Sequence, residues 1–453
     1  MITNHVVSSE ILNNGCRLDS SFHLSSGNMA RNCIAQSPLS THNIGFYTKT
    51  IFYGNRAKRI YVDKKDFGIP FLSSSDILQA DLENVKYVSK KHTPNIEEQK
   101  LKYGWTLITR SGTVGKTTYS THLHEGKLSS EHVIRVVPNE KIKSGCLYAY
   151  LSSSYGYALL TQGMFGAVIQ SIEPSYIEDL PIPIFSMDFQ NEVDGLIQEY
   201  ASLREEATYA LRKAIKLFED EIGTSNISLG YQTVSVSSKD ISSKFTRFDS
   251  QYQIGRSELN KKKHGLNCIK IGSIASKILV GNRGKREYVE KNGIPFLSSS
   301  DMMLANPLRQ CKMIRKSSKN IENLLVSKGD ILISRSGTVG NTVLVSNTLN
   351  GVAVSEHAMK LRINSSLIAP EYVYAYLQTR QGQDSLHILP YGSVIVTLGE
   401  DFLADIDLPL IATEKMEDII SLIKDYCKKT DESIIKESTA ISLVEQEIDK
   451  WNN

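Results

Sequence analysis

Two long stretches of the chain place apolar or small residues in alternating steps of four and three. In residues 188–222, which contain no proline, they fall at positions 189, 193, 196, 200, 203, 207, 210, 214 and 217. In residues 412–453 the same rhythm runs from Met416 to Trp451, with Thr430 and Glu437 as polar members. A heptad seam predicts a helix that packs against another helix. We therefore expect two long antiparallel helices that form a coiled-coil spacer.

The rest of the chain repeats one globular unit. Residues 68–76 and 293–301 both read GIPFLSSSD, and residues 110–115 and 335–340 both read RSGTVG, at one constant offset along the chain. Short β-branched and aromatic runs alternate with Gly, Pro, Asn and Ser clusters, which favours a mixed sheet with many loops, and residues 147–160 are expected to form one helix. A repeat of this length indicates two copies of a domain.

The predicted fold class is therefore α+β, with two similar α/β domains joined by the helices. The expected domain order is a first globular domain, a central helix, a second globular domain and a C-terminal helix, with the bounds 1–187, 188–222, 223–411 and 412–453.

Charge is unevenly distributed between these parts. The helical segments 188–222 and 412–453 carry −5 and −4, and the whole chain carries +3, so the two globular copies together carry +12. Two basic domains on acidic helices suit a polyanion bound at two places, although lysines that only confer solubility remain an alternative. The six cysteines have no metal-site spacing, and no apolar run is long enough to span a membrane. We expect a cytoplasmic protein without a metal site.

The sequence favours a protein that binds without catalysing a reaction. The stretch RSGTVGK at 110–116 ends in a Gly-Lys pair, as a phosphate-binding P-loop does. A P-loop has four residues between its first glycine and that pair, whereas this stretch has two. The pairs Glu131-His132 and Glu356-His357 lack a nucleophile at a motif spacing, so a structural role is expected. No methyltransferase motif is present, and no catalytic residue is assigned.

Arginine at the end of a strand, beside a glycine turn, can bind guanine or a phosphate, and basic loops between strands can do the same. An internal salt bridge at the arginines and a solvated loop remain alternatives. The candidate DNA-binding residues of the first copy are Asn55, Arg56, Lys58, Arg59, Arg110, Ser111 and Lys116. Those of the second copy are Lys261, Lys262, Lys263, Asn282, Arg283, Lys285, Arg286, Arg335 and Ser336.

The chain resembles the specificity subunit of type I restriction-modification systems over almost its whole length. The resemblance rests on the repeat with its helices, on GDILISRSGTVG at 329–340 with GWTLITRSGTVG at 104–115, and on Arg-Leu-Asp-Ser and Arg-Phe-Asp-Ser at 17–20 and 247–250.

The resemblance implies that each globular domain is a target-recognition domain that reads one half of a bipartite double-stranded DNA target. It further implies that modification (methyltransferase) subunits dock on the helices and that a restriction subunit joins the complex. S-adenosylmethionine, ATP and Mg²⁺ would bind those partners, and this chain would need no cofactor. Two alternatives stay open: recognition for a related phage-defence methylation system, and a self-sufficient nucleotide-dependent enzyme or nuclease.

Overall fold

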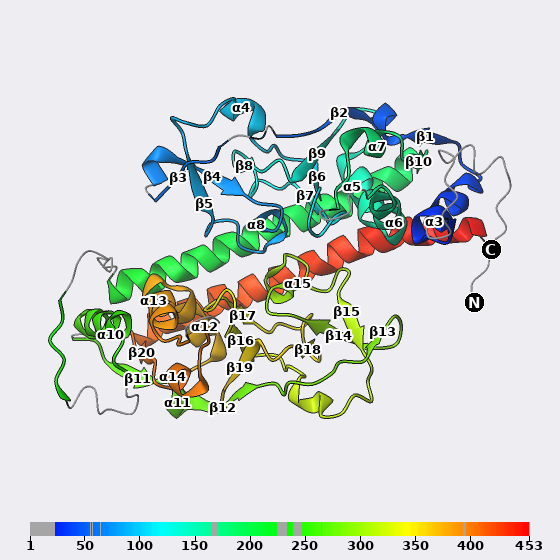
Figure 1. Cartoon of the computed structure of the whole chain (residues 1–453). Helices are drawn as coiled ribbons and strands as arrows, with labels where there is room; N and C mark the ends of the chain where they lie inside the picture. The colour runs from blue at the N-terminus through cyan, green and yellow to red at the C-terminus, as the bar shows by residue number, and fades with distance from the viewer. Residues whose placement is uncertain are drawn as a thin grey trace. The chain divides into compact units, whose positions relative to one another are not determined.

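The computed structural model describes residues 23–54, 56, 58–63, 65–164, 170–223, 233–238, 247–263, 265–392 and 396–452 (Figure 1). The chain forms two compact units. The first contains residues up to Glu205 together with Glu432–Asn453, and the second is Glu206–Asp431. This division runs through both long helices, whereas the boundaries predicted from the sequence lie at the helix ends.

Among its described residues, the first unit contains three small sheets. A four-stranded antiparallel sheet has the order β2-β9-β6-β7, and a second sheet has the order β3-β5-β4-β8, in which only β4 and β8 are parallel. Strands β1 and β10 form a separate antiparallel pair. The strands are β1 Thr41–Asn43, β2 Thr48–Tyr53, β3 Tyr61–Val62, β4 Gly68–Leu72, β5 Lys86–Ser89, β6 Thr106–Thr109, β7 Thr117–Tyr119, β8 Leu128–Ser129, β9 Val133–Pro138 and β10 Pro181–Pro183.

The second unit repeats this topology strand for strand. Its sheets have the orders β12-β19-β16-β17 and β13-β15-β14-β18, and β11 pairs with β20. The strands are β11 Cys268–Lys270, β12 Ala275–Val280, β13 Tyr288–Val289, β14 Ile294–Leu297, β15 Lys312–Ile314, β16 Ile331–Ser334, β17 Thr342–Leu344, β18 Ala353–Val354, β19 Ala358–Ile363 and β20 Asp407–Pro409. The repeated motifs of the sequence are thus two copies of one fold.

Short helices complete each unit. In the first they are α3 Ser26–Ala35, α4 Ile96–Gln99, α5 Ser144–Ser152, α6 Ser154–Gln162 and α7 Pro174–Glu178. In the second they are α10 Ser250–Lys262, α11 Ile271–Ile274, α12 Pro370–Gln378, α13 Arg380–Ile388 and α14 Glu400–Ala404.

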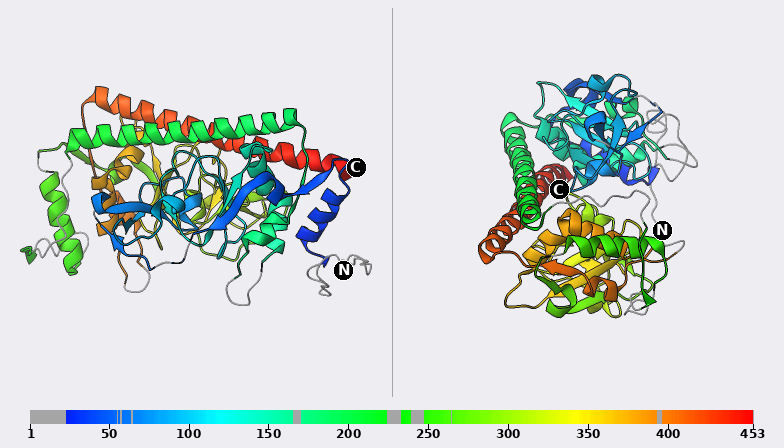
Figure 2. Two further views of the ribbon diagram at one scale, coloured as in Figure 1. Left: turned by 90° about the horizontal axis from the view of Figure 1, so that it is seen from above. Right: turned by 90° about the vertical axis from the view of Figure 1, so that its left-hand side faces the viewer.

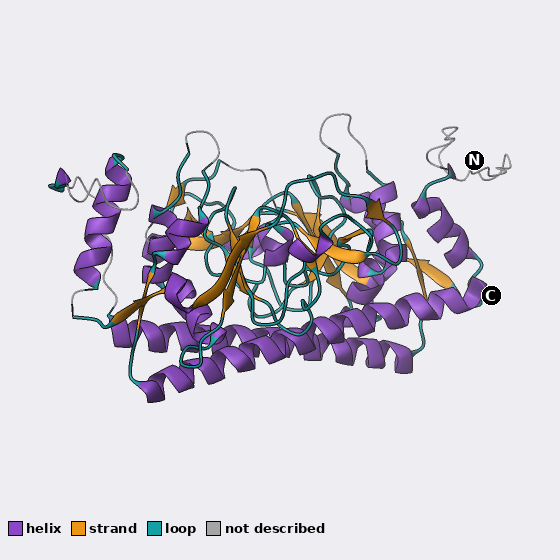
Figure 3. Cartoon of the chain, turned by 90° about the horizontal axis from the view of Figure 1, so that it is seen from below, coloured by secondary structure: helices purple, strands orange, loops and turns teal. Residues whose placement is uncertain are grey.

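One short helix in each unit lies between a sheet and the long helices α8 Met187–Ile222 and α15 Thr413–Asp449 (Figure 3). In the first unit α5 packs on β7, and its Tyr148 hydroxyl donates a hydrogen bond to Glu437 of α15. In the second unit α12 packs on β17, and its Tyr372 ring stacks on Phe218 of α8 at 4.8 Å. Both helices are buried almost all round, as a helix between two layers must be.

The single helix expected over residues 147–160 is wrong, because the chain divides there into α5 and α6. Ser153 has an extended ψ of 163°, and its side chain accepts a hydrogen bond from the backbone N–H of Gly156. A serine at an N-cap satisfies a free donor of the next helix and so favours a new start. Gly156 is needed because a Cβ there would meet the Tyr150 carbonyl oxygen at 2.2 Å.

The two long helices pair antiparallel, as predicted (Figures 1 and 2). In the first unit Lys436 of α15 binds Glu199 of α8 at 2.5 Å. In the second unit Lys429 binds Glu206 at 3.1 Å. Each of these ion pairs joins the two helices within one unit, as charged residues that flank a coiled-coil seam do.

Apolar residues of both long helices enter the core of each unit. Ile197 and Val444 belong to the first core, and Phe218 and Ile423 belong to the second. Among the described residues, no helix is both long enough and apolar enough to cross a membrane.

Candidate nucleic-acid interface

The two RSGTVG segments form the turns between β6 and β7 and between β16 and β17. In each turn both glycines have a positive φ: Gly112 at 81° and Gly115 at 84°, Gly337 at 78° and Gly340 at 97°. A side chain at these positions would strain the backbone, which explains why both glycines are present in each copy. The turn closes on β6 through the N–H of Thr109, which donates to the Lys116 carbonyl at 2.8 Å.

The first turn is joined to a partly buried acidic residue and to a basic loop. The Ser111 hydroxyl contacts His132 Nδ1 at 2.5 Å, and His132 Nε2 lies 3.5 Å from a carboxylate oxygen of Glu131. The other carboxylate oxygen of Glu131 pairs with Arg59, whose guanidinium also lies 4.9 Å from the centroid of the Phe71 ring. These contacts hold together the loop after β2, the segment before β9 and the turn after β6.

The second unit repeats two of these contacts at equivalent positions. Ser336 contacts His357 Nδ1 at 2.6 Å, and Arg286 pairs with Glu356 at 3.2 Å. The constant feature of both copies is therefore an arginine held by a glutamate at the base of a loop. The sequence predicts Arg59 and Arg286 as DNA-binding residues. In the structure each pairs with a glutamate, and these pairs hold the loop in place.

The serine, histidine and glutamate have the composition of a catalytic triad but not its surroundings. The Glu131 carboxylate already pairs with Arg59, and the cavity beside these two residues measures about 20 Å³. Such a volume holds about one water molecule and no substrate. Within the described ranges, no group of three or more His, Cys, Asp or Glu side chains could hold a metal ion. The geometry supports the structural role expected for Glu131-His132.

The other basic side chains of these loops are exposed to solvent. Arg56 and Lys58 in the first copy are exposed, as are Arg283 and Lys285 in the second, and within the described part of the chain none of these four has an ion-pair partner. Asn282 is also exposed, and its carbonyl accepts from Arg286 at 2.6 Å. Asn55 lies outside the described residues. Each unit thus presents two free cations on a loop that an Arg–Glu pair holds in place.

The lysines at the end of α10 are not equivalent to one another. Lys261 is exposed and pairs with Glu258 one turn earlier at 2.6 Å. Lys263 pairs with Asp407, which joins the end of α10 to β20. The side chain of Lys262 lies outside the described residues. Lys261 and Lys263 therefore differ from the cations of the basic loops, because each has an acidic partner. The ion pair of Lys263 has a structural role.

The two turn arginines differ although their loops are identical. Arg110 is 8% exposed, pairs with Glu173 and lies over the Tyr53 ring at 4.2 Å. Arg335 is half-buried, and its Nε donates to the Leu398 carbonyl at 3.3 Å. No carboxylate among the described residues pairs with Arg335. Lys116 of the first turn is half-buried and becomes Asn341 in the second.

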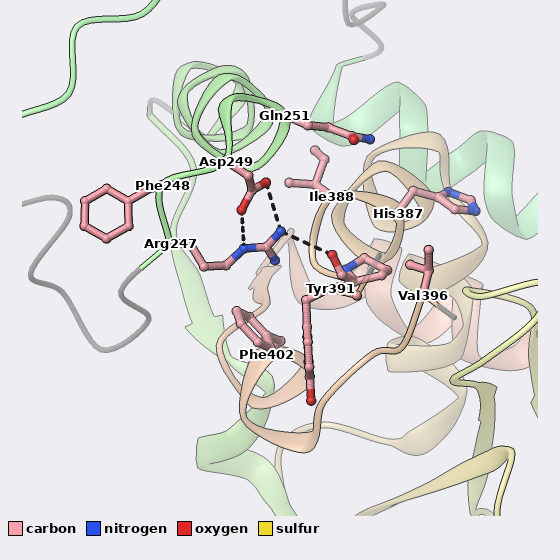
Figure 4. Close-up of a pocket in the computed structure, with 11 residues that line it drawn as sticks. Arg247, Phe248, Asp249, Gln251, His387, Ile388, Tyr391, Val396 and Phe402 are labelled. Carbon is pink, nitrogen blue, oxygen red and sulfur yellow. Dashed lines mark hydrogen bonds and ion pairs between the residues drawn. The ribbon is translucent and has the colours of Figure 1, made fainter. Parts of the chain in front are cut away.

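A cavity of about 700 Å³ lies beside the start of α10 (Figure 4). At its wall Arg247 Nε donates to Asp249 at 2.7 Å, and its guanidinium lies over the Tyr252 ring at 4.3 Å. This ion pair lowers the pKa of Asp249 below its usual value. Arg247 also donates to the Leu389 carbonyl at 2.7 Å, so the Arg-Phe-Asp-Ser motif joins α10 to the segment after α13. Its first-copy counterpart, residues 17–20, lies outside the described residues.

Each copy also buries one cation, on strand β9 in the first and on strand β19 in the second. Arg135 in the first copy is fully buried and donates to the Ser129 carbonyl at 3.0 Å. Lys360 occupies the equivalent position in the second copy and donates to the carbonyls of Asn323 and Leu325 at 2.5 and 3.0 Å. Burial lowers the pKa of Arg135 to about 10 and that of Lys360 to about 8.

Sequence reasoning missed the contact between the turn serine and the histidine. Both motifs recur at the same offset between the two copies, and this common offset could have indicated that they meet. It also missed Glu173 and Tyr53, the partners of Arg110. No motif marked these two, because they are absent from the equivalent positions of the second copy.

Comparison with known proteins finds a family match in the second half of the chain. Residues 267–442 match the family model described as the type I restriction modification DNA specificity domain. No curated protein sequence matches the chain.

Solved structures similar to the chain include the S subunit of a type I restriction-modification system from M. genitalium, at 11% identity and a TM-score of 0.36, with 92% of this chain and 96% of that chain covered. Another is the HsdS subunit from Thermoanaerobacter tengcongensis, at 14% identity and a TM-score of 0.29, with 91% and 96% covered. A third comes from a study of complex assembly and conformational transition of the type I system, at 14% identity and a TM-score of 0.29, with 92% and 97% covered.

Proposed function

We propose that the whole chain is the DNA-recognition subunit of a type I restriction-modification complex, because residues 267–442 match the DNA specificity domain of that family. Each globular copy binds one half of a bipartite duplex target. The first copy is included because its sheets have the same strand order and it carries the same RSGTVG turn.

One observation supports this proposal above the others. Both copies carry a pair of exposed cations without an acidic partner among the described residues, Arg56 with Lys58 and Arg283 with Lys285, on loops held by Arg–Glu pairs. A preorganised basic loop loses little freedom on binding and can contact phosphates or base edges in a groove. Two such loops, on two copies of one domain, suit a target with two halves.

The long helices would set the separation of the two half-sites and would dock the modification subunits. Their sequences are rich in acidic residues, so contact with DNA is disfavoured there and contact with protein is favoured. In this proposal the chain itself is not an enzyme. S-adenosylmethionine, ATP and Mg²⁺ bind the modification and restriction subunits and supply methyl transfer and translocation there.

Methylome sequencing tests the proposal. A host that expresses the chain with the modification subunit encoded beside it should carry N6-methyladenine at a bipartite motif with a fixed gap. The modification subunit alone should leave that motif unmethylated. Methylation that does not depend on the chain, or ATP hydrolysis or DNA cleavage by the purified chain, would contradict the assignment.

A further inference from the structure

We infer that the two identical RSGTVG turns use DNA differently: Arg335 of the second copy contacts the target, whereas Arg110 of the first copy is a structural residue. This inference rests on the proposed function and deepens it, because it assigns a DNA contact to one copy and excludes it from the other. Sequence alone treats the two arginines alike.

The first arginine offers no exposed bonding face. Its guanidinium pairs with Glu173 on one side and lies over the face of Tyr53 on the other, and only 8% of the residue is exposed. To contact DNA, Arg110 would have to give up both its ion pair with Glu173 and its stacking on Tyr53. We call Tyr53 and Glu173 the arginine clamp.

The second copy lacks both members of this clamp. Glu173 is the residue before α7 and follows Ile172, whose N–H donates to the Arg110 carbonyl at 3.2 Å. In the second copy Leu398 makes the same bond to Arg335 at 2.8 Å, and the residue that follows it, before α14, is Gly399.

Tyr53 is replaced as well. It ends β2 opposite Ile134, and the corresponding end of β12, opposite Met359, is Val280. Neither glycine nor valine can pair with a guanidinium or stack on it.

Arg335 therefore keeps an unused hydrogen-bonding fork. The only bond of its side chain within the described part of the chain is from Nε to the Leu398 carbonyl, at 3.3 Å, so its terminal nitrogens can bind a ligand. A guanidinium in this state binds guanine O6 and N7 or two phosphate oxygens as a bidentate donor. The bond to Leu398 fixes the direction of the side chain beforehand.

The residue at the end of the turn also differs between the copies, but here it is the first copy that has the available cation. The first copy has Lys116 at the end of the turn, and the second has Asn341. Each turn thus offers one cation that no acidic side chain of the described ranges binds: Lys116 in the first copy and Arg335 in the second. Lysine acts as a point charge, whereas arginine has the planar geometry that a base edge requires.

The first experiment compares matched single substitutions. The full chain is assembled with its modification subunits, and binding is measured to a duplex that contains the methylated motif found for the wild type. Arg335→Ala should weaken binding by about tenfold or more. Arg110→Ala should leave the affinity of the folded fraction unchanged and should lower thermal stability instead.

Transfer of the clamp tests the inference without removing either arginine. Val280→Tyr with Gly399→Glu should hold Arg335 and reproduce the loss of Arg335→Ala. Position 399 has room for the Cβ of a side chain, because Gly399 has an ordinary φ of −92° and an added Cβ would meet the Phe402 and Tyr391 rings at 3.4 Å. Tyr53→Val with Glu173→Gly should release Arg110 and should not lower the affinity.

The type of contact follows from a modified duplex. If Arg335 binds guanine, replacement of that guanine by 7-deazaguanine should weaken wild-type binding and should add nothing to Arg335→Ala. If Arg335 binds phosphate, the Arg335→Ala substitution should weaken binding to target and non-target DNA equally.

Equal losses for Arg110→Ala and Arg335→Ala in folded protein, or no loss for Arg335→Ala and the transferred clamp, would overturn the inference. Failure of the proposed function would look different, because the wild-type chain itself would then direct no methylation and bind no target.

Discussion

The Glu219 carboxylate on α8 accepts a hydrogen bond from the backbone N–H of Arg380, the first residue of α13, at 2.8 Å. Its counterpart is Glu445 on α15, which accepts from the N–H of Ser154, the first residue of α6, at 2.6 Å. The two glutamates are as far apart in the sequence as the two donors are. Each globular domain is therefore held by the long helix of the other copy, through a carboxylate at a helix N-terminus, where negative charge is favoured.

This relationship predicts that Glu219→Ala and Glu445→Ala each destabilise the fold by about 1 kcal/mol, as loss of an N-terminal helix cap does. Glu221→Ala is the matched control, because Glu221 lies on the same helix, is exposed and has no partner among the described residues. Urea denaturation followed by circular dichroism measures the effect. Equal stability of all three variants would show that these bonds do not stabilise the domains.

A second prediction concerns Asp431, which fixes the second domain to its own helix. This carboxylate is 6% exposed and accepts from the Ser346 hydroxyl at 2.5 Å and from the N–H groups of Asn347 and Thr348 at 3.0 and 3.1 Å. Asp431→Ala leaves the buried Ser346 hydroxyl and two part-buried N–H groups without this acceptor, so we expect a loss of about 1–3 kcal/mol. Within the described ranges Glu205, at the equivalent position of α8, accepts one hydrogen bond, from the His122 N–H, in a more exposed setting, so Glu205→Ala should cost less than half as much. Calorimetric unfolding of both variants tests this order.

The repeat, the two long helices and the sheet-rich domains could be predicted from sequence, because heptad spacing and a constant offset are properties of residue order alone. The break at Ser153 could not, because an N-cap is recognised only once the backbone turns. The separate roles of Arg110 and Arg335 could not either. Their loops are identical, and the difference lies in Glu173 and Tyr53, which reach Arg110 only through the fold.

The third prediction is a pH dependence that comes from Lys360. Burial lowers its pKa to about 8, below the value of 10.5 that a lysine has in the unfolded chain. Between these two values the unfolded chain binds the proton and the folded chain does not, so this group makes the free energy of unfolding rise with pH. Below pH 8 the lysine is charged in both states and its contribution to the slope vanishes.

Lys360→Arg isolates this contribution, because the first copy carries arginine at the same position. The pKa of Lys360 also responds to the charges of Asp330, Lys277 and Arg362. Buried cysteines such as Cys427 have raised pKa values, and their titration makes stability change with pH in the opposite direction. The informative quantity is therefore the difference in stability between wild type and variant at each pH. We expect the wild type to gain stability relative to Lys360→Arg from pH 8 to pH 10. Parallel stability curves would show that Lys360 does not titrate in this range.

The fourth prediction concerns the polar position Glu437 in the seam of α15. Its side chain is 2% exposed and accepts from the Tyr148 hydroxyl of α5. Tyr148→Phe removes a donor from a buried carboxylate and should cost about 1.5–3 kcal/mol. Tyr148→Phe combined with Glu437→Leu should recover much of this loss, because replacement of both polar partners by apolar groups can be nearly neutral. If the double variant is as unstable as the sum of its parts, the two side chains act independently.

The last prediction links the exposed cations to DNA affinity. Each phosphate contact releases counterions, so the slope of log affinity against log salt measures the number of contacts, at about 0.9 per contact. Arg283→Ala with Lys285→Ala should reduce this slope by about 2 if both side chains bind phosphates. Lys213→Ala with Lys424→Ala removes the same charge from the long helices and should leave the slope unchanged, because these lysines are exposed on helices assigned to protein contacts. If the slope falls in both double variants, DNA affinity depends on the total charge of the chain. The basic loop of the second copy would then not be a DNA contact.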